Sequence, residues 1–164
     1  MFKIGDRVVY PMHGAGVVKD VVVKDIMGKK EEYLIIMMPI GNIKISVPVE
    51  NAQNIGVRDV IDVKELEEVY DVLKGNKSKM SVNWNKRYRE NLEKLKKGDV
   101  LEVAEVVRNL SIMDKNKGLS TGEKKMLNSA KKMLISEMVI VENDIYASVE
   151  KKIENAISYF EEGE

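Results

Sequence analysis

The residues best suited to contact a partner surround Trp84, the only tryptophan of the chain. Three cations follow it within a turn and a half of helix: Lys86, Arg87 and Arg89. An apolar ring beside cations can enter a base step in the minor groove of DNA while the cations bind phosphates. This pattern indicates a DNA wedge whose contacts to the backbone do not depend on sequence.

The same ring could instead begin the buried face of a helix. Apolar residues recur after it at helical spacing: Tyr88, Leu92 and Leu95. A bulky apolar side chain in such a pattern usually belongs to the core. The sequence leaves both alternatives open, since a ring at a helix start can rest one edge on the core and expose the other.

Catalytic and metal chemistry have few candidate residues. The chain has one histidine, His13, and no cysteine, which excludes disulfides and thiolate zinc sites. The segment from His13 to Gly16 lacks the Lys-Ser/Thr ending of a phosphate loop, and it is interpreted as a turn that enters a strand. We therefore expect no metal, no cofactor and no enzymatic activity, and a binding protein is the favoured class.

The charge of the chain is uneven although its net value is zero. Residues 77–97 carry eight Lys/Arg against two Glu, and residues 115–132 carry six Lys against one Glu. Residues 137–164 carry eight acids against two Lys. Such runs are often only the solvated faces of helices, but two basic segments can also bind nucleic acid.

The first third of the chain has a β pattern. All three prolines lie there, among Val- and Ile-rich runs that are separated by Gly and Pro. Four strands are expected, near residues 7–10, 15–24, 32–37 and 43–47. Several short strands within about 60 residues indicate a small, bent β-barrel of the SH3 or Tudor kind. We assign this barrel to residues 1–55.

The rest of the chain has a helical pattern. Capping signals are expected at Asp62, Asp99 and Ser120, and the last helix should open at Asn143 or Asp144. The apolar stripes between them predict about five helices that pack as one domain over residues 62–164, after a linker at residues 56–61. The expected architecture is therefore α+β with two domains.

The chain has no apolar run near the ~20 residues that a membrane span needs. Its first residues also lack the pattern of a signal peptide. We expect a cytoplasmic protein without membrane contact, and a monomer.

The ordered motifs of the chain carry a resemblance. The first half contains Phe2 to Pro11 with His13-Gly14, then Val47 to Ala52, then Gly56 to Val60. The second half contains Asn83 to Leu95, Val103 to Arg108, Gly118 to Ser120 and Gly122 to Leu127. In these motifs the chain resembles, almost end to end, the CarD/CdnL family of bacterial transcription regulators that bind RNA polymerase.

The resemblance implies a specific function. By this resemblance, the chain would have an N-terminal Tudor-like domain of the kind shared with the transcription-repair coupling factor. This domain would bind the protrusion and lobe region of the polymerase β subunit. Its helical domain would contact promoter DNA at the upstream edge of the melted bubble and stabilise the open complex. Trp84 would be the minor-groove wedge, and the phosphate contacts would come from Lys86, Arg87, Arg89, Lys124 and Lys125.

The resemblance also implies where the polymerase binds. The expected contacts are Lys24, Asp25, Ile26, Met27, Gly28, Ser46 and Pro48. Some members carry Arg at positions 24 and 46, where this chain has Lys and Ser; lysine keeps the charge but not the bidentate fork of arginine, and Ser46 removes the charge. The alternative function is a protein-only adaptor that binds through the edge of the barrel, with Trp84 in the core.

Overall fold

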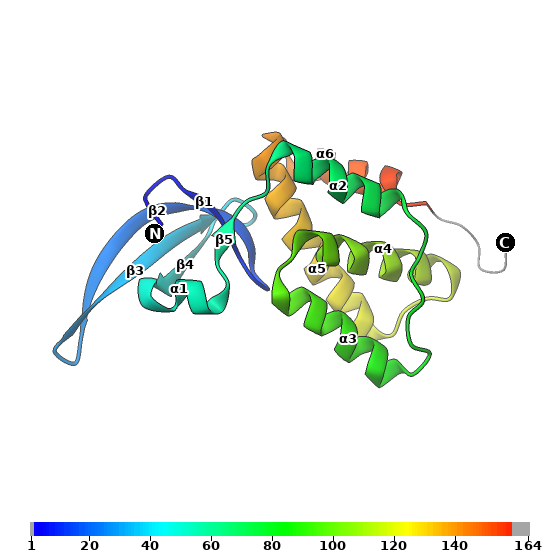
Figure 1. Ribbon diagram of the computed structural model, residues 1–164, viewed down its shortest axis with the longest axis horizontal. Helices are drawn as coiled ribbons and strands as arrows, with labels where there is room; N and C mark the ends of the chain where they lie inside the picture. Colours follow the sequence, from blue (N-terminus) through cyan, green and yellow to red (C-terminus); the bar gives the residue numbers. More distant parts are fainter. Residues whose placement is uncertain (1, 159–164) are drawn as a thin grey trace.

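The computed structural model describes residues 2–158 and has the expected α+β architecture (Figure 1). A five-stranded antiparallel sheet with one short helix forms the β half, residues 7–59, and five helices of the described residues form the helical half, residues 63–156. The two halves lie side by side, and they meet where β1, β5 and the start of β2 approach α5.

The sheet has the strand order β4-β3-β2-β1-β5. Its elements are β1 (Arg7–Tyr10), β2 (Gly14–Ile26), β3 (Lys29–Met38), β4 (Ile43–Pro48), α1 (Val49–Ile55) and β5 (Arg58–Asp59). The four strands expected from the sequence are confirmed, because alternating apolar residues and Gly or Pro breaks are local signals. The short elements α1 and β5 were not predicted. The strand β5 lies within residues 56–61, which were expected to be a linker, and it pairs with β1.

One face of the sheet carries the first hydrophobic core. Cross-strand partners lie on the same face, so the pairs Val18–Ile36 and Leu34–Val47 stack on one side. These four residues are at most 1% exposed, and Ala52 of α1 packs on the same cluster. The helix α1 therefore closes the apolar side of the sheet. The other side is open along β3 and β4 but is buried at Val9 and Ala15, where α5 approaches.

The hairpin of β2 and β3 extends well beyond the rest of the sheet (Figure 1). Its two-residue turn, Met27-Gly28, has positive φ at both positions, 52° and 81°. This backbone is typical of the tight hairpin turns that match the twist of the strands. The tip of the hairpin is a tight turn that points away from the helices (Figure 1).

The helical half contains five helices in the described residues: α2 (Val63–Lys74), α3 (Trp84–Lys97), α4 (Val100–Asn116), α5 (Thr121–Glu142) and α6 (Tyr146–Ala156). The expected caps are present, since Asp62, Asp99 and Ser120 each accept hydrogen bonds from the first turn of their helix. The last helix starts one or two residues later than expected, because its N-cap is Ile145 and not Asn143 or Asp144. Asn143 is instead the left-handed C-cap of α5, with φ 51°, and α6 follows Ile145.

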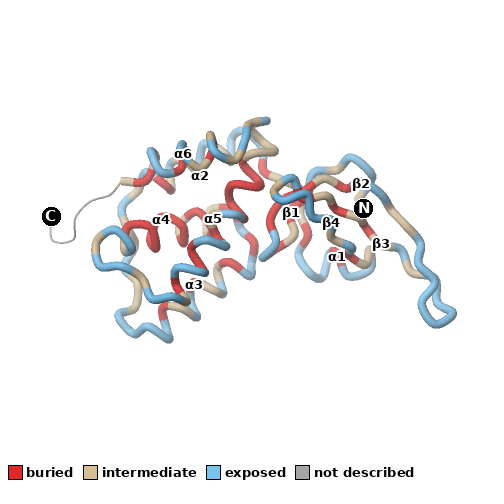
Figure 2. The backbone as a smooth tube through the Cα atoms, turned by 180° about the vertical axis from the view of Figure 1, so that it is seen from behind, coloured by how far each residue is buried: buried red, intermediate tan, exposed pale blue. Residues whose placement is uncertain are grey.

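The second hydrophobic core lies between the helices (Figure 2). The helices α4 and α5 contribute most of its buried residues, while α2, α3 and α6 each bury one stripe. Within residues 2–158, no helix combines the length and apolar character that crossing a bilayer would require.

Candidate nucleic-acid and polymerase interface

Trp84 is the first residue of α3, and its ring is partly open to solvent. The preceding residue, Asn83, caps the helix by accepting a hydrogen bond from the backbone of Lys86 at 3.0 Å. Trp84 is 42% exposed, whereas Leu95 on the same stripe is 1% exposed. The stripe thus runs from the surface at Trp84 into the core at Leu95, and the ring is not a sealed core residue.

Two helices hold the indole of Trp84. The ring stacks on Tyr88, one turn later in α3, with centroids 5.3 Å apart and planes inclined by 21°. Its Nε1 donates a hydrogen bond of 2.8 Å to the hydroxyl of Ser120, the N-cap of α5. Both features anticipated at the sequence level coexist, because one part of the ring rests on protein while another part faces water.

Arg87 does not belong to the exposed cations expected from the sequence. Its side chain is 10% exposed, and its guanidinium makes a bidentate pair with Glu123 at 2.8 and 2.9 Å. It also donates to the backbone carbonyl of Ser81 at 3.2 Å. We therefore remove Arg87 from the candidate phosphate contacts and assign it to the packing of α3 on α5.

The Arg87–Glu123 pair also shifts the ionisation of both partners. The hydrogen bonds from Arg87 hold the pKa of Glu123 below its usual range, and Ser120 contributes in the same direction. The hydrogen bond to Glu123 raises the pKa of Arg87, although burial opposes this. Both groups are therefore charged near neutral pH, in a site with little access to water.

The other candidate cations are exposed. Lys86 lies 3.9 Å from Glu90 in a solvent-exposed pair, which is a weak contact. The side chains of Arg89, Lys124 and Lys125 make no ion pair or hydrogen bond with the described residues. All four sit on the first two turns of α3 and α5, and the Trp84–Ser120 hydrogen bond joins these two helix starts.

The acidic residues of α2 lie away from these helix starts. On α2, four acids are exposed: Glu65, Glu67, Glu68 and Asp71. In Figure 1, α2 and α6 lie along one side of the helical half, and α3 lies along the opposite side. Because α2 carries four acids against two Lys and α3 carries six Lys/Arg against two Glu, the neutral net charge hides an uneven distribution.

The candidate polymerase residues gather on the β2–β3 hairpin and on β4. At the turn, Met27 is 99% exposed, and two neighbouring apolar residues of β2 are also exposed, Val23 at 61% and Ile26 at 46%. Asp25 and Gly28 are exposed beside them. An exposed apolar tip on a hairpin is a typical protein-binding feature.

Lys24, Ser46 and Pro48 lie on one face of the sheet. The register pairs Lys24 with Glu31, and it pairs Ser46 and Pro48 with alternate residues of β3. The Nζ of Lys24 donates to the hydroxyl of Ser46 at 3.2 Å and lies 4.7 Å from the centre of the Tyr33 ring. Positions 24 and 46 are thus in contact across this face of the sheet.

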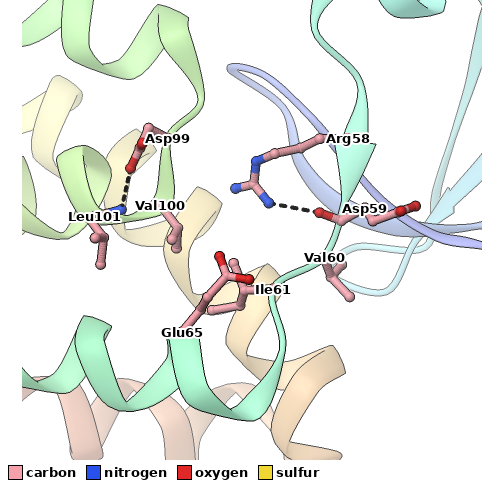
Figure 3. A pocket seen from close by; sticks show the side chains of 8 residues that line it. All are labelled: Arg58, Asp59, Val60, Ile61, Glu65, Asp99, Val100 and Leu101. Carbon is pink, nitrogen blue, oxygen red and sulfur yellow. Dashed lines mark hydrogen bonds between the residues drawn. The ribbon is translucent and has the colours of Figure 1, made fainter.

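A clamp between the two halves was not predicted. Arg58 of β5 makes a bidentate pair with Glu137 of α5, with both distances 2.8 Å, and donates to the carbonyl of Gly98 at 3.0 and 2.9 Å. Glu137 also accepts from the backbone of Ile61 at 2.9 Å. The first residues of α4 and the segment after β5 line a pocket of about 300 Å³ beside this clamp (Figure 3).

A second contact strengthens this junction. The backbone N–H of Ala15, at the start of β2, donates to the hydroxyl of Ser136 at 2.8 Å. A Cβ on Gly14 would lie 2.5 Å from that hydroxyl, so the close approach requires glycine there. The only sequence signals for the junction were a polar Ser136-Glu137 pair within an apolar helix and the Gly14 turn.

We expect Glu137→Ala to lower the free energy of unfolding by about 2–3 kcal/mol. This loss is smaller than the loss from breaking a fully buried ion pair, because the side chain of Arg58 is partly exposed. The change leaves Arg58 without its carboxylate and Ile61 N–H without its acceptor. The measurement is the midpoint of urea unfolding. Glu102→Ala is the control, since Glu102 pairs with Lys97 at 3.7 Å on the surface. Equal effects of both changes would contradict the clamp.

Both halves of the chain match models of known protein families. A model described as "CarD, C-terminal domain" matches residues 68–154, and one described as "CarD-like/TRCF RID domain" matches residues 2–61. The chain is a member of the CarD family. This family consists of transcription regulators, and its RID domain interacts with RNA polymerase.

A sequence relative of this CarD-family protein supports the assignment. The chain is 38% identical over 141 residues to the "Putative transcription factor YdeB" of Bacillus subtilis (strain 168), covering 86% of this chain and 92% of the relative. It is also similar to the solution NMR structure of the 72-residue N-terminal domain of Myxococcus xanthus CarD. That match has 32% identity and a TM-score of 0.32, and it covers 36% of this chain and 79% of the other.

Proposed function

We propose that this CarD-family protein docks on the β subunit of RNA polymerase and stabilises the open promoter complex. In this proposal Trp84 enters the minor groove at the upstream edge of the melted bubble, while Lys86, Arg89, Lys124 and Lys125 contact phosphates. The polymerase contact is the exposed hairpin with the open face of β4. The chemistry is binding alone.

The observation that carries the proposal is the exposure of Trp84 beside cations of two helices. A ring that is 42% exposed can reach a base step without unfolding the helix that carries it. The exposed lysines and Arg89 surround the same helix starts, where they can hold the DNA backbone without reading its sequence. The acidic α2 side would face away from DNA, which favours one orientation.

The energies fit a protein that acts only on polymerase-bound DNA. Unstacking a base step costs a few kcal/mol, and DNA that is already kinked at a bubble edge has lost part of its stacking. The ring therefore prefers the open state and shifts the equilibrium by its difference in affinity. Contact with the β subunit raises the local concentration, so weak affinity for free DNA suffices. The net charge of zero agrees with recruitment by polymerase rather than by DNA.

The hairpin supports the polymerase contact. Its tip offers exposed Val23, Ile26 and Met27, and its open face offers Pro48 beside the Lys24–Ser46 contact. Since β4 is an edge strand, its backbone can also pair with a strand of a partner. Lys24 supplies a charge that is already directed by Ser46 and Tyr33, so this interface would depend more on apolar contact than one that carries two arginines.

We expect Met27→Asp to weaken binding to the polymerase β subunit by about tenfold or more, because full burial of a methionine side chain is worth about 1.5–3 kcal/mol. The fold should not change, as Met27 is 99% exposed and φ is positive there, which Asp tolerates. The measurement is the Kd for the isolated β lobe and protrusion. Ile145→Asp is the control, since Ile145 is an exposed apolar residue of the helical half. Unchanged binding with Met27→Asp would contradict a hairpin contact.

The contacts of the Trp84 ring also give some support to a protein-only adaptor. Its stacking on Tyr88 and its bond to Ser120 could serve packing alone. That function predicts that Trp84→Ala unfolds the helical half and that promoter DNA near the bubble gives no crosslink to the protein. A folded Trp84→Ala protein that no longer prolongs the open complex favours the wedge.

A further inference from the structure

The hydroxyl of Ser120 connects the start of α5 to Trp84. It accepts hydrogen bonds from Trp84 Nε1 at 2.8 Å and from the backbone N–H of Glu123 at 3.2 Å. It donates to Glu123 Oε1 at 3.2 Å. A serine hydroxyl has one hydrogen to donate and two lone pairs that accept, so these contacts use all of them. The direction of the hydroxyl is therefore fixed by its surroundings.

The same part of α5 supports the edge of the indole. A Cβ built on Gly122 would lie 3.6 Å from Cζ2 of Trp84 and 3.8 Å from Cε2 of Tyr88, which is ordinary contact distance. In an indole, Nε1 and Cζ2 are both bonded to Cε2 and belong to one edge. That edge of the indole lies beside α5, and one face of the ring stacks on Tyr88. The part of the ring that is exposed to solvent is therefore the opposite face and the other edges.

The Arg87–Glu123 pair keeps this arrangement in place. Arg87 and Trp84 lie in the first turn of α3, and Glu123 and Ser120 lie in the first turn of α5. The bidentate pair is buried, at 10% and 2% side-chain exposure. It fixes Glu123, which in turn holds the hydroxyl that binds the indole.

We propose that Ser120 is a positioning residue that sets the orientation of the Trp84 indole before DNA arrives. The value of that orientation for the open complex rests on the proposed function. An exposed side chain without such a bond would occupy several rotamers, and its ordering on binding would cost affinity. Ser120 acts through Trp84 and needs no contact with DNA.

The first test reads the indole directly in the full-length protein. Because the chain has one tryptophan, its ¹H–¹⁵N spectrum contains a single indole N–H signal. Ser120→Gly removes the hydroxyl but keeps most of the N-cap stability, whereas Ser120→Thr keeps both. We expect Ser120→Gly to move the indole signal and to speed its exchange with water, and Ser120→Thr to restore it.

A matched control separates positioning from helix capping. Asp62 is the N-cap of α2 and accepts a hydrogen bond of 2.8 Å from the backbone of Glu65. It therefore caps a different helix from the one whose cap, Ser120, binds the indole. We expect Asp62→Gly to lower stability slightly and to leave the indole signal in place. An indole signal that does not move in Ser120→Gly would overturn the positioning role, whatever happens on DNA.

The second test reads the lifetime of the open complex on polymerase. We expect Ser120→Gly to shorten it about threefold, the effect of losing one ordinary hydrogen bond, and Ser120→Thr to keep it near wild type. A benzothienylalanine at position 84 removes the N–H donor without touching the α5 cap, and it should shorten the lifetime equally.

The outcomes distinguish the two proposals. If Trp84→Ala shortens the lifetime while Ser120→Gly and the benzothienyl analogue do not, the positioning role is wrong and the wedge stands. If Trp84→Ala also has no effect in a folded protein, the proposed function fails, and with it the value of the indole orientation for the open complex, while the indole signal of Ser120→Gly still decides whether Ser120 positions the ring.

Discussion

Arg87→Ala is expected to lower the free energy of unfolding by about 3–5 kcal/mol, because it leaves a buried carboxylate without its partner. Glu123 is 1% exposed, and its bidentate contact with Arg87 is its main source of charge compensation. The melting temperature, Tm, should fall by on the order of 10 °C. The measurement is calorimetry of the full chain at neutral pH.

Acid unfolding gives a second readout of the same pair. Because Arg87 lowers the pKa of Glu123, the stability from this pair is present above the unfolded carboxyl pKa of about 4 and is lost as pH falls through the folded value. The Arg87→Ala protein should lack this part of the pH dependence and should already be weakened at neutral pH.

The matched control is Arg89→Ala, which removes the same charge from the same helix. Arg89 is exposed, so its loss should change stability by less than about 0.5 kcal/mol while reducing contact with promoter DNA. A stable Arg87→Ala protein that loses DNA contact as Arg89→Ala does would show that Arg87 binds phosphate after all. The two arginines therefore have separable effects.

Trp84→Ala is expected to shorten the lifetime of the open promoter complex by about 5–150-fold, the range of typical couplings between a bound ligand and a conformational equilibrium. The ring loses its preference for the unstacked DNA step, whereas the polymerase contact through the hairpin remains. The loss in folding stability should be about 2 kcal/mol, because the 42% exposed Trp84 loses both its stacking on Tyr88 and its hydrogen bond to Ser120. The measurement is the decay of open complexes after addition of a competitor.

Val82→Ala is the control for the Trp84 experiment. Val82 is 98% exposed and precedes the ring by two residues, so its loss tests whether any apolar side chain of this segment has the same effect. We expect no change in lifetime with Val82→Ala. A folded Trp84→Ala protein with the wild-type lifetime would exclude the wedge, and an unfolded one would support the adaptor.

Much of the fold could be predicted because its signals are local. Asp62 and Ser120 each precede a glutamate by three residues, and both cap a helix as that spacing indicates. Gly98 ends α3 in a left-handed conformation that glycine adopts without strain. The start of α6 was expected one or two residues too early because Asn143 can serve either as an N-cap or as a left-handed C-cap, and only its position at the end of α5 decides between them.

The site was predicted less completely, since its contacts join distant parts of the chain. Arg87 has the same local sequence environment as Lys86 and Arg89, but its partner Glu123 lies 36 positions away. Ser120 was recognised as a cap, yet its bond to Trp84 spans another 36 positions. Arg58 and Glu137 are 79 positions apart.

The sequence by itself determined which segments form strands and which form helices, and where most of these elements begin and end. It also determined the uneven distribution of charge and the position of Trp84 at the start of a basic helix. These properties follow from spacing and local backbone preference within a few residues. Only the tertiary structure decided which arginine is buried, how the indole is held and how the sheet joins the helices. These features depend on which turns of different helices pack together. When packing brings a carboxylate beside an arginine, or a hydroxyl beside an indole, the hydrogen bonds that form hold that side chain in one orientation.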